Sequence, residues 1–196
     1  MKKTKVMIKT PDGEFENNLI FFDKSDKPML KKMFNCWVDL CELSIKAGGT
    51  RTINLPETLS EAIFSIDMNV GRCVEGISGS SSSFDHYDHK NHKRIQLKAA
   101  SSYGPSSFGP RSEYDDIYFF FFREMADSKK RRERVFDGSY EIYKLDTNLI
   151  PNIMVNRSET VKDQQRKGKR PRFIIPEQMI KPFNLKPIKK GNIEKW

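Results

Sequence analysis

The stretch DDIYFFFFREM, residues 115–125, decides the fold of this 196-residue chain. Five aromatic residues follow one another from Tyr118 to Phe122, which is too many for a helix with one solvated side. A strand covered on both faces accommodates such a run, because successive side chains point to opposite faces of a sheet. We therefore predict a central sheet with other elements packed on each side.

Working outward, the segment GSYEIYKLD, residues 138–146, predicts a second strand of the same sheet. The charged segment ADSKKRRER at 126–134 lies between the two strands and predicts a solvated tip, whose cations would add phosphate contacts beside DNA. Upstream, apolar residues at spacings of three and four predict helices over 28–47 and 57–68. Glu61 points away from the apolar face of the second helix. Together these elements predict an α/β fold with a mixed central sheet flanked by helices.

A hairpin is predicted from SSSSFDHYDHKNHKRIQLKA, residues 80–99. The composition of GISGSSSS before it is typical of a flexible linker, but here the run leads into the first strand. In the second strand, Ile95 and Leu97 share one face, while Gln96 and Lys98 share the other. If the strands pair in register, Asp85 lies close to Gln96 and Lys98. Such a cluster of oxygen ligands beside an ammonium predicts a site for a divalent metal ion and a water molecule.

The three histidines of the chain, His86, His89 and His92, also fall in this hairpin. A zinc site would need their side chains to converge on one point, as they would on a helix. Because the surrounding sequence predicts a turn between strands, we expect a solvated tip with some phosphate contact. Zinc binding by these histidines stays open as the alternative.

Composition limits the class of protein. The fractions of hydrophobic residues (37%) and charged residues (31%) are those of one globular domain spanning 1–196. The formal net charge of +9 favours a polyanionic partner such as nucleic acid. No apolar stretch has the length of a signal peptide or of a membrane-spanning helix, so we expect a cytoplasmic protein without a membrane partner. The cysteines Cys36, Cys41 and Cys73 predict neither a disulfide set nor a zinc site.

The pattern of Asp85, ten residues, and then Gln96, Leu97 and Lys98 resembles the motif of the PD-(D/E)XK nucleases. Gln96 departs from the acid usual at its position, which leaves more of the metal binding to Asp85, Glu61 and the Leu97 carbonyl. A glutamate-bearing helix before the hairpin, here with Glu61, also matches that superfamily. Catalysis by Asp85, Gln96, Lys98 and Glu61 with Mg²⁺ as cofactor is what this resemblance implies, with Glu57 and Asp67 as alternates for Glu61.

Several segments between Asn54 and Ile175, including INLPETLSEAIFSID and TVKDQQRKGKRPRF, together resemble small type II restriction endonucleases of the Bsp-six-I family, which recognise GCNGC. The resemblance implies a bacterial cytoplasmic enzyme that cuts double-stranded DNA as a homodimer. It also implies a DNA methyltransferase of the same specificity in the cell. The catalytic core would span 54–145, and a basic DNA-recognition tail 156–196.

Candidate DNA contacts lie mainly in the segment DQQRKGKRPRF of this tail. Arginine pairs bidentately with guanine, so Arg170 and Arg172 are the favoured base contacts for a G/C site, although most protein contacts to DNA go to the backbone. The full set is Gln164, Gln165, Arg166, Lys169, Arg170 and Arg172, with Ser107 and Arg111 in the loop after the catalytic strand. Two alternatives stay open, a structure-specific nuclease of the same superfamily and a basic nucleic-acid-binding module without catalysis.

Overall fold

The computed structural model of the protein describes residues 1–50, 53–75, 84–109, 113–124 and 136–196. Its main sheet contains the strands β1 (Lys2–Thr10), β2 (Gly13–Phe21), β3 (Gly71–Cys73), β4 (His86–Asp88), β5 (Lys93–Ala100), β7 (Asp116–Glu124), β8 (Phe136–Leu145) and β10 (Lys189–Asn192). They lie in the order β1-β2-β3-β4-β5-β7-β8-β10. Neighbouring strands are antiparallel except β5 and β7, which are parallel. The predicted mixed sheet is confirmed.

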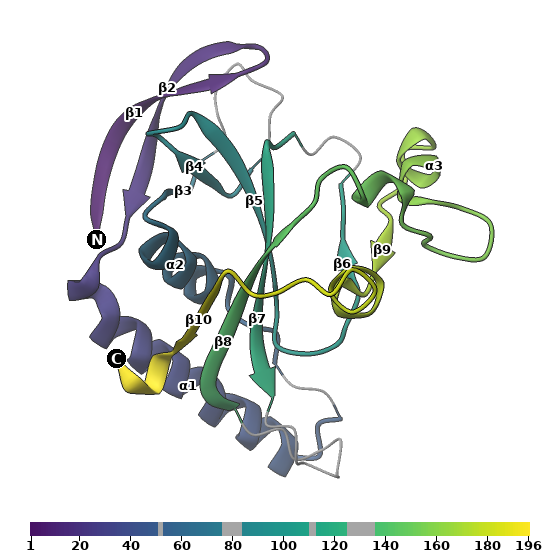
Figure 1. The fold of residues 1–196 in the computed structure, drawn as a ribbon. Coiled ribbons are helices and arrows are strands. Elements are labelled where there is room, and N and C mark those ends of the chain that lie inside the picture. The colour runs from purple at the N-terminus through teal and green to yellow at the C-terminus, as the bar shows by residue number, and fades with distance from the viewer. Residues whose placement is uncertain (51–52, 76–83, 110–112, 125–135) are drawn as a thin grey trace.

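Strand β7 lies inside this sheet with β5 on one side and β8 on the other (Figure 1). Phe120 and Phe122 belong to one hydrophobic cluster, whereas Phe119 and Phe121 belong to a second. All four rings are buried. The aromatic run therefore supplies both layers of the core, as its sequence predicted.

Two helices, α1 (Lys27–Lys46) and α2 (Glu57–Met68), pack against the first of these clusters. Both agree with their predicted ranges to within one residue. Pro28 lies in the first turn of α1, where its missing N–H costs no hydrogen bond. Helix α2 stops at Asn69, which adopts the left-handed conformation. Neither these helices nor any other in the described ranges is long and apolar enough to cross a membrane.

The other face of the sheet is covered by shorter elements. Strands β6 (Ser106–Ser107) and β9 (Arg172–Phe173) form a separate antiparallel ladder, and helix α3 (Val161–Arg166) precedes β9 (Figure 1). The remaining short helices are η1 (Lys24–Asp26), η2 (Ile150–Asn152), η3 (Pro176–Ile180) and η4 (Ile193–Lys195). The end of the chain returns to the main sheet as β10, beside β8.

The hairpin β1–β2 at the edge of the sheet was not predicted. Its turn, TPDGE at residues 10–14, carries Pro, Asp and Gly in the order typical of a tight turn. Gly13 there has a φ of 137°, a region that side chains other than hydrogen rarely allow. Strand β2 pairs with β3, so this hairpin supports β3, which pairs in turn with β4.

Three sequence predictions lie outside the described residues: the serine-rich stretch at 76–83, the charged tip at 126–134, and Arg111.

Gly191 of β10 tests how tightly the core is packed. A Cβ atom at this position would overlap with Cζ of Tyr140, whose buried ring stacks on Phe120. We expect Gly191→Ala to lower the free energy of unfolding by about 1–3 kcal/mol, measured by urea denaturation. Gly104→Ala is the control, because its Cβ would meet only Ser102 Oγ at 3.7 Å. Equal losses in the two variants would contradict this packing argument.

Candidate active site

Asp85 is held between two strands by its backbone. Its N–H donates to the carbonyl of Ile95 at 3.0 Å, and its carbonyl accepts from the N–H of Cys73 at 2.8 Å. These two bonds fix the backbone from which the Asp85 side chain extends, directly before β4. Carboxylate oxygen Oδ2 accepts a hydrogen bond from the N–H of Leu97 at 2.6 Å and another from Nε2 of Gln96.

Gln96 is buried and also lies close to the main chain of its neighbour. Its Nε2 is 3.5 Å from the carbonyl oxygen of Leu97 while it contacts the Asp85 carboxylate. The structure thus brings together three of the predicted site positions, Asp85, Gln96 and Leu97. The antiparallel register of β4 and β5, in which His86 faces Ile95, produces this juxtaposition.

Glu61 comes from α2 and is only 7% exposed, so it is not a solvated helix residue. Its carboxylate forms an ion pair with the guanidinium of Arg72, which also lies 3.7 Å from the exposed Glu57. Burial raises the pKa of Glu61 to about 7, against the opposing effect of Arg72, and the nearby Asp85 raises that pKa further. The charge of Asp85 therefore acts on Glu61, which indicates that the two acids lie near each other. The alternate Asp67 instead accepts a hydrogen bond from Tyr140 at 2.7 Å.

Arg72 is the residue that sequence analysis missed. It lies on β3, a strand of three residues, which is too short to show a period in the sequence. Nothing near Arg72 in the sequence marks it as the partner of Glu61, since the pairing depends on how β3 lies beside α2.

Lys98 follows on the same strand as Gln96, beside a cleft of about 420 Å³. The cleft is lined by Asn54 and Leu55, by residues 97–102 and by residues 104–107. Burial lowers the pKa of the Lys98 ammonium; the charge of Asp85 opposes this, and that of Arg170 adds to it. Burial also raises the pKa of Asp85, partly offset by the Leu97 N–H and by Lys98. Two buried acids and a lysine with mutually shifted pKa values, the lysine lining a cleft, are typical of a functional site.

The expectation of a solvated histidine tip is wrong for His86. That side chain is fully buried in β4, where its Nε2 lies 3.0 Å from the carbonyl of Glu61 and its ring meets Phe64 edge-on. Burial lowers the pKa of His86 to about 3, so the ring is neutral. His89 packs edge-on against Phe21, and His92 lies 3.2 Å from the Tyr87 hydroxyl. The three rings thus contact three different partners.

The structure joins the two predicted DNA-contact segments. Ser107 of β6 pairs with Arg172 of β9, and the ring of Phe108 stacks on Phe173 at 4.5 Å. Lys98 Nζ lies 5.6 Å from the centre of the same Phe108 ring. The tail and the end of the candidate catalytic strand therefore form one packed unit.

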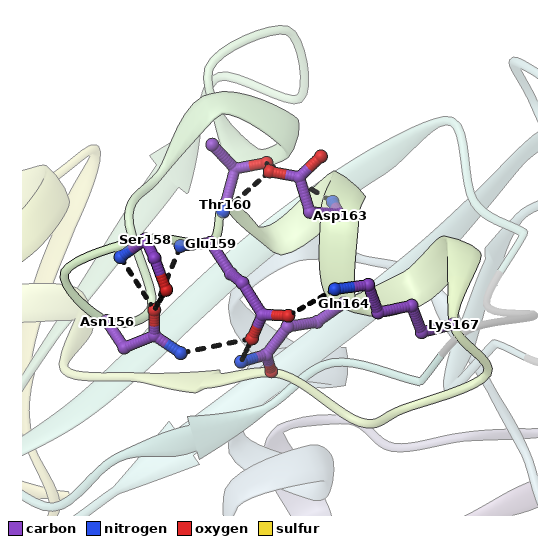
Figure 2. A network of polar contacts seen from close by, with 7 residues as sticks. All are labelled: Asn156, Ser158, Glu159, Thr160, Asp163, Gln164 and Lys167. Atoms are coloured by element: carbon purple, nitrogen blue, oxygen red, sulfur yellow. Dashed lines mark hydrogen bonds and ion pairs between the residues drawn. The ribbon is translucent and has the colours of Figure 1, made fainter.

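Polar side chains hold helix α3 in place beside this ladder (Figure 2). Glu159 accepts hydrogen bonds from Gln164 at 3.0 Å and from Asn156, and it pairs with Lys167 at 2.6 Å. These donors lower the pKa of Glu159 to about 2. Gln165 donates to the carbonyl of Gly109 at 3.0 Å. The amides of Gln164 and Gln165 thus support the tail itself.

The four cations predicted to contact DNA from the tail are exposed and, within the described part of the chain, have no ion-pair partner: Arg166, Lys169, Arg170 and Arg172.

Within the described ranges, no three His, Cys, Asp or Glu side chains are grouped to hold a metal ion. A cation at this site would therefore depend on ligands of other types, such as the Gln96 amide and the Leu97 carbonyl.

Glu61→Gln tests the buried carboxylate. Because the pKa of Glu61 rises from 4.5 to about 7 on folding, the folded chain binds this proton more tightly, and its stability falls as pH rises between these values. We expect the variant to match the wild type near pH 4.5 and to exceed its free energy of unfolding by up to about 3 kcal/mol at pH 8, in EDTA. Glu57→Gln, at an exposed carboxylate, should follow the wild type. A pH-independent difference for Glu61→Gln would contradict the shift.

Comparison with known proteins places these residues in a family. The sequence profile described as Bsp6I (Bsp-six-I) restriction endonuclease matches residues 22–182, which include Glu61, Asp85 and Lys98 but not the hairpin β1–β2. The type II restriction enzyme Bsp6I of Bacillus sp. (strain RFL6) is 28% identical over 180 residues, covering 89% of this chain and 92% of that enzyme. No solved structure is significantly similar. Because the profile covers well over half of its length, the chain belongs to the Bsp6I restriction endonuclease family.

Proposed function

We propose that this chain is a type II restriction endonuclease that hydrolyses phosphodiester bonds of double-stranded DNA at GCNGC, leaving 5′-phosphate and 3′-hydroxyl ends. The observation that carries the proposal is the cluster of Asp85, Gln96 and Leu97 beside Lys98 at the cleft. Membership of the Bsp6I family supports it. The order of these residues supports a PD-(D/E)XK site, with Gln96 at the position of the second acid.

The donor set fits a hard divalent cation such as Mg²⁺. Nε2 of Gln96 contacts both the Asp85 carboxylate and the Leu97 carbonyl, so the structure brings the oxygen donors of these residues close together. Rotating the amide would present Oε1 of Gln96 as a third oxygen, and Mg²⁺ prefers oxygen ligands. Asp85, Gln96 and Leu97 would hold the ion, and the carboxylate of Glu61 would complete the shell around it. Mg²⁺ bound there would supply positive charge to the scissile phosphate.

Lys98 acts on the nucleophile and on the developing charge. Its ammonium orients the attacking water for in-line displacement and neutralises charge that builds on the phosphate oxygens. Burial lowers the pKa of Lys98, which increases the fraction of neutral amine that can accept a proton from the attacking water. Arg72 holds the Glu61 carboxylate in place and compensates its charge.

The β6–β9 ladder and the tail bring the DNA to this site. Arg170 and Arg172 reach base edges, while Ser107 and the other exposed cations contact phosphates near the cut. The proximity of Arg170 to Lys98, seen in its effect on the lysine pKa, supports this arrangement. Because GCNGC is two-fold symmetric, two identical subunits each cut one strand. The chain would act as one nuclease domain in the bacterial cytoplasm, alongside a methyltransferase of the same specificity.

Plasmid digestion tests the function. We expect discrete fragments with Mg²⁺ and intact plasmid with EDTA. Lys98→Ala should lose at least 100-fold in cleavage rate but keep specific binding in Ca²⁺, because the basic surface is unchanged. Lys93→Ala is the matched control, since this lysine lies at the other end of β5, 3.4 Å from Asp116.

Each other outcome of that assay identifies an alternative. Cleavage without discrete fragments would indicate a structure-specific nuclease, and binding without Mg²⁺-dependent cleavage a non-catalytic module. Cleavage by Lys98→Ala within about tenfold of wild type would remove the role given to Lys98.

Competition binding in Ca²⁺ separates base contacts from phosphate contacts. We expect Arg170→Ala or Arg172→Ala to weaken binding to GCNGC by about 1–3 kcal/mol, and more than binding to a scrambled duplex. Lys167→Ala is the control, because Lys167 already pairs with Glu159 and should affect both duplexes alike. Equal losses on both duplexes for both arginines would move specificity to the loop that contains Ser107.

A further inference from the structure

Helix α1 carries two apolar stripes, and only one of them is used by the fold. Leu30, Phe34, Trp37 and Cys41 form the stripe that is buried in the core. The second stripe consists of Met29, Met33, Cys36, Leu40 and Leu43, at spacings of four, three, four and three. We call this second set the outer stripe. Its alternation of four and three is the spacing by which one helix packs along another.

The outer stripe is largely open to solvent. Met29 is 47% exposed, Leu40 is 50% exposed and Leu43 is 60% exposed, and Cys36 between them is also exposed. Met33 is partly buried against the core. Figure 1 shows α1 along the outside of the fold, with η4 at the end of the chain beside it. Side chains of this size, aligned along a helix of 20 residues that is about 30 Å long, are typical of an interaction surface.

Two charges flank the centre of the outer stripe. Lys32 lies one helical turn before Cys36, and Asp39 lies one turn after it. Both are exposed, and neither has an ion-pair partner among the described residues. The surface along the outer stripe is therefore basic on the N-terminal side of Cys36 and acidic on its C-terminal side.

This charge pattern is complementary to itself in one orientation. If two copies of α1 pack antiparallel around a two-fold axis at Cys36, Met29 lies beside the partner's Leu43 and Lys32 beside the partner's Asp39. Parallel packing would instead place the partner's Lys32 and Asp39 on the opposite side of the contact and leave these charges unmatched. A surface that matches its own copy under a two-fold rotation is what a symmetric dimer requires.

We propose that the outer stripe of α1 is the surface through which two copies of this chain associate, antiparallel and with the two Cys36 residues at the axis. The proposal rests on the proposed function, in which a symmetric DNA site is cut by two subunits. It adds the contact surface and the residues that set the orientation of the subunits.

Charge reversal tests the orientation. The variant Lys32→Glu brings two carboxylates together at both equivalent contacts of the dimer, and the variant Asp39→Lys brings two ammonium groups together at both. We expect each variant to dimerise at least about tenfold more weakly by sedimentation equilibrium, with an unchanged melting midpoint of the monomer. An equimolar mixture of the two variants, and the double variant Lys32→Glu with Asp39→Lys, should restore a Kd within about threefold of wild type, because opposite charges meet again.

Cross-linking tests the axis. A short bis-maleimide should join two wild-type chains through Cys36, since Cys36 is exposed, whereas Cys41 is buried and Cys73 is only half-exposed. Cys36→Ser should abolish the cross-link while leaving the sedimentation behaviour unchanged. A dimer that neither charge variant weakens and that Cys36 does not cross-link would overturn the proposal.

Cleavage measured in parallel separates this proposal from the proposed function. A monomeric wild-type chain that cuts both strands at GCNGC would overturn the dimer surface and leave the nuclease intact. A dimer that behaves as expected but never cuts DNA with Mg²⁺ would overturn the nuclease and leave the surface. Dimers that survive both charge reversals but not Leu43→Lys would overturn the antiparallel orientation.

Discussion

The structure depends on the burial of β7 on both faces. Because side chains on a strand alternate, the aromatic run of β7 requires one layer of cover on each side of the sheet. Strand β5 lies parallel to β7 with Leu97 beside Tyr118 and Lys98 beside Phe119. Leu97 therefore packs in the cluster covered by α1 and α2, whereas Lys98 lies on the opposite face of the sheet, beside Phe108. The position of the lysine follows from the packing of its neighbour strand.

The acids of the site depend on a different part of the sheet. Asp85 is anchored by hydrogen bonds to both β3 and β5, and β3 is held in turn by the N-terminal hairpin through β2. Arg72, on β3, reaches Glu61 of α2. The strand that compensates the buried acid is thus fixed by residues outside the family match, which begins at residue 22. Burying ionisable groups is costly, and such clusters are commonly kept where chemistry uses them.

What the sequence predicted well were features that depend on local pattern. The aromatic run, the two helices and the placement of Gln96 and Lys98 on the face of β5 opposite Leu97 all follow from periodicity. The hairpin β1–β2 was missed although its Pro-Asp-Gly turn was visible, because the lysines on β1 hide an apolar alternation. His86 was placed in a solvated turn, since no local signal shows that α2 covers β4. Arg72 was missed for the same reason, because its partner lies on an element that is distant in sequence.

The basic tail shows why net charge alone does not identify a DNA-binding surface. Lys167 is part of the network around Glu159, whereas Arg170 and Arg172 extend into solvent from the segment around Pro171. Pro171 is buried, and its carbonyl accepts a hydrogen bond from the N–H of Phe108 at 3.0 Å, which fixes the backbone between the two arginines. The ring of Phe108 also lies beside Lys98, whose Nζ is 5.6 Å from the ring centre. The segment proposed to read DNA and the lysine proposed to act in cleavage are therefore positioned by the same stacked pair of rings, Phe108 and Phe173.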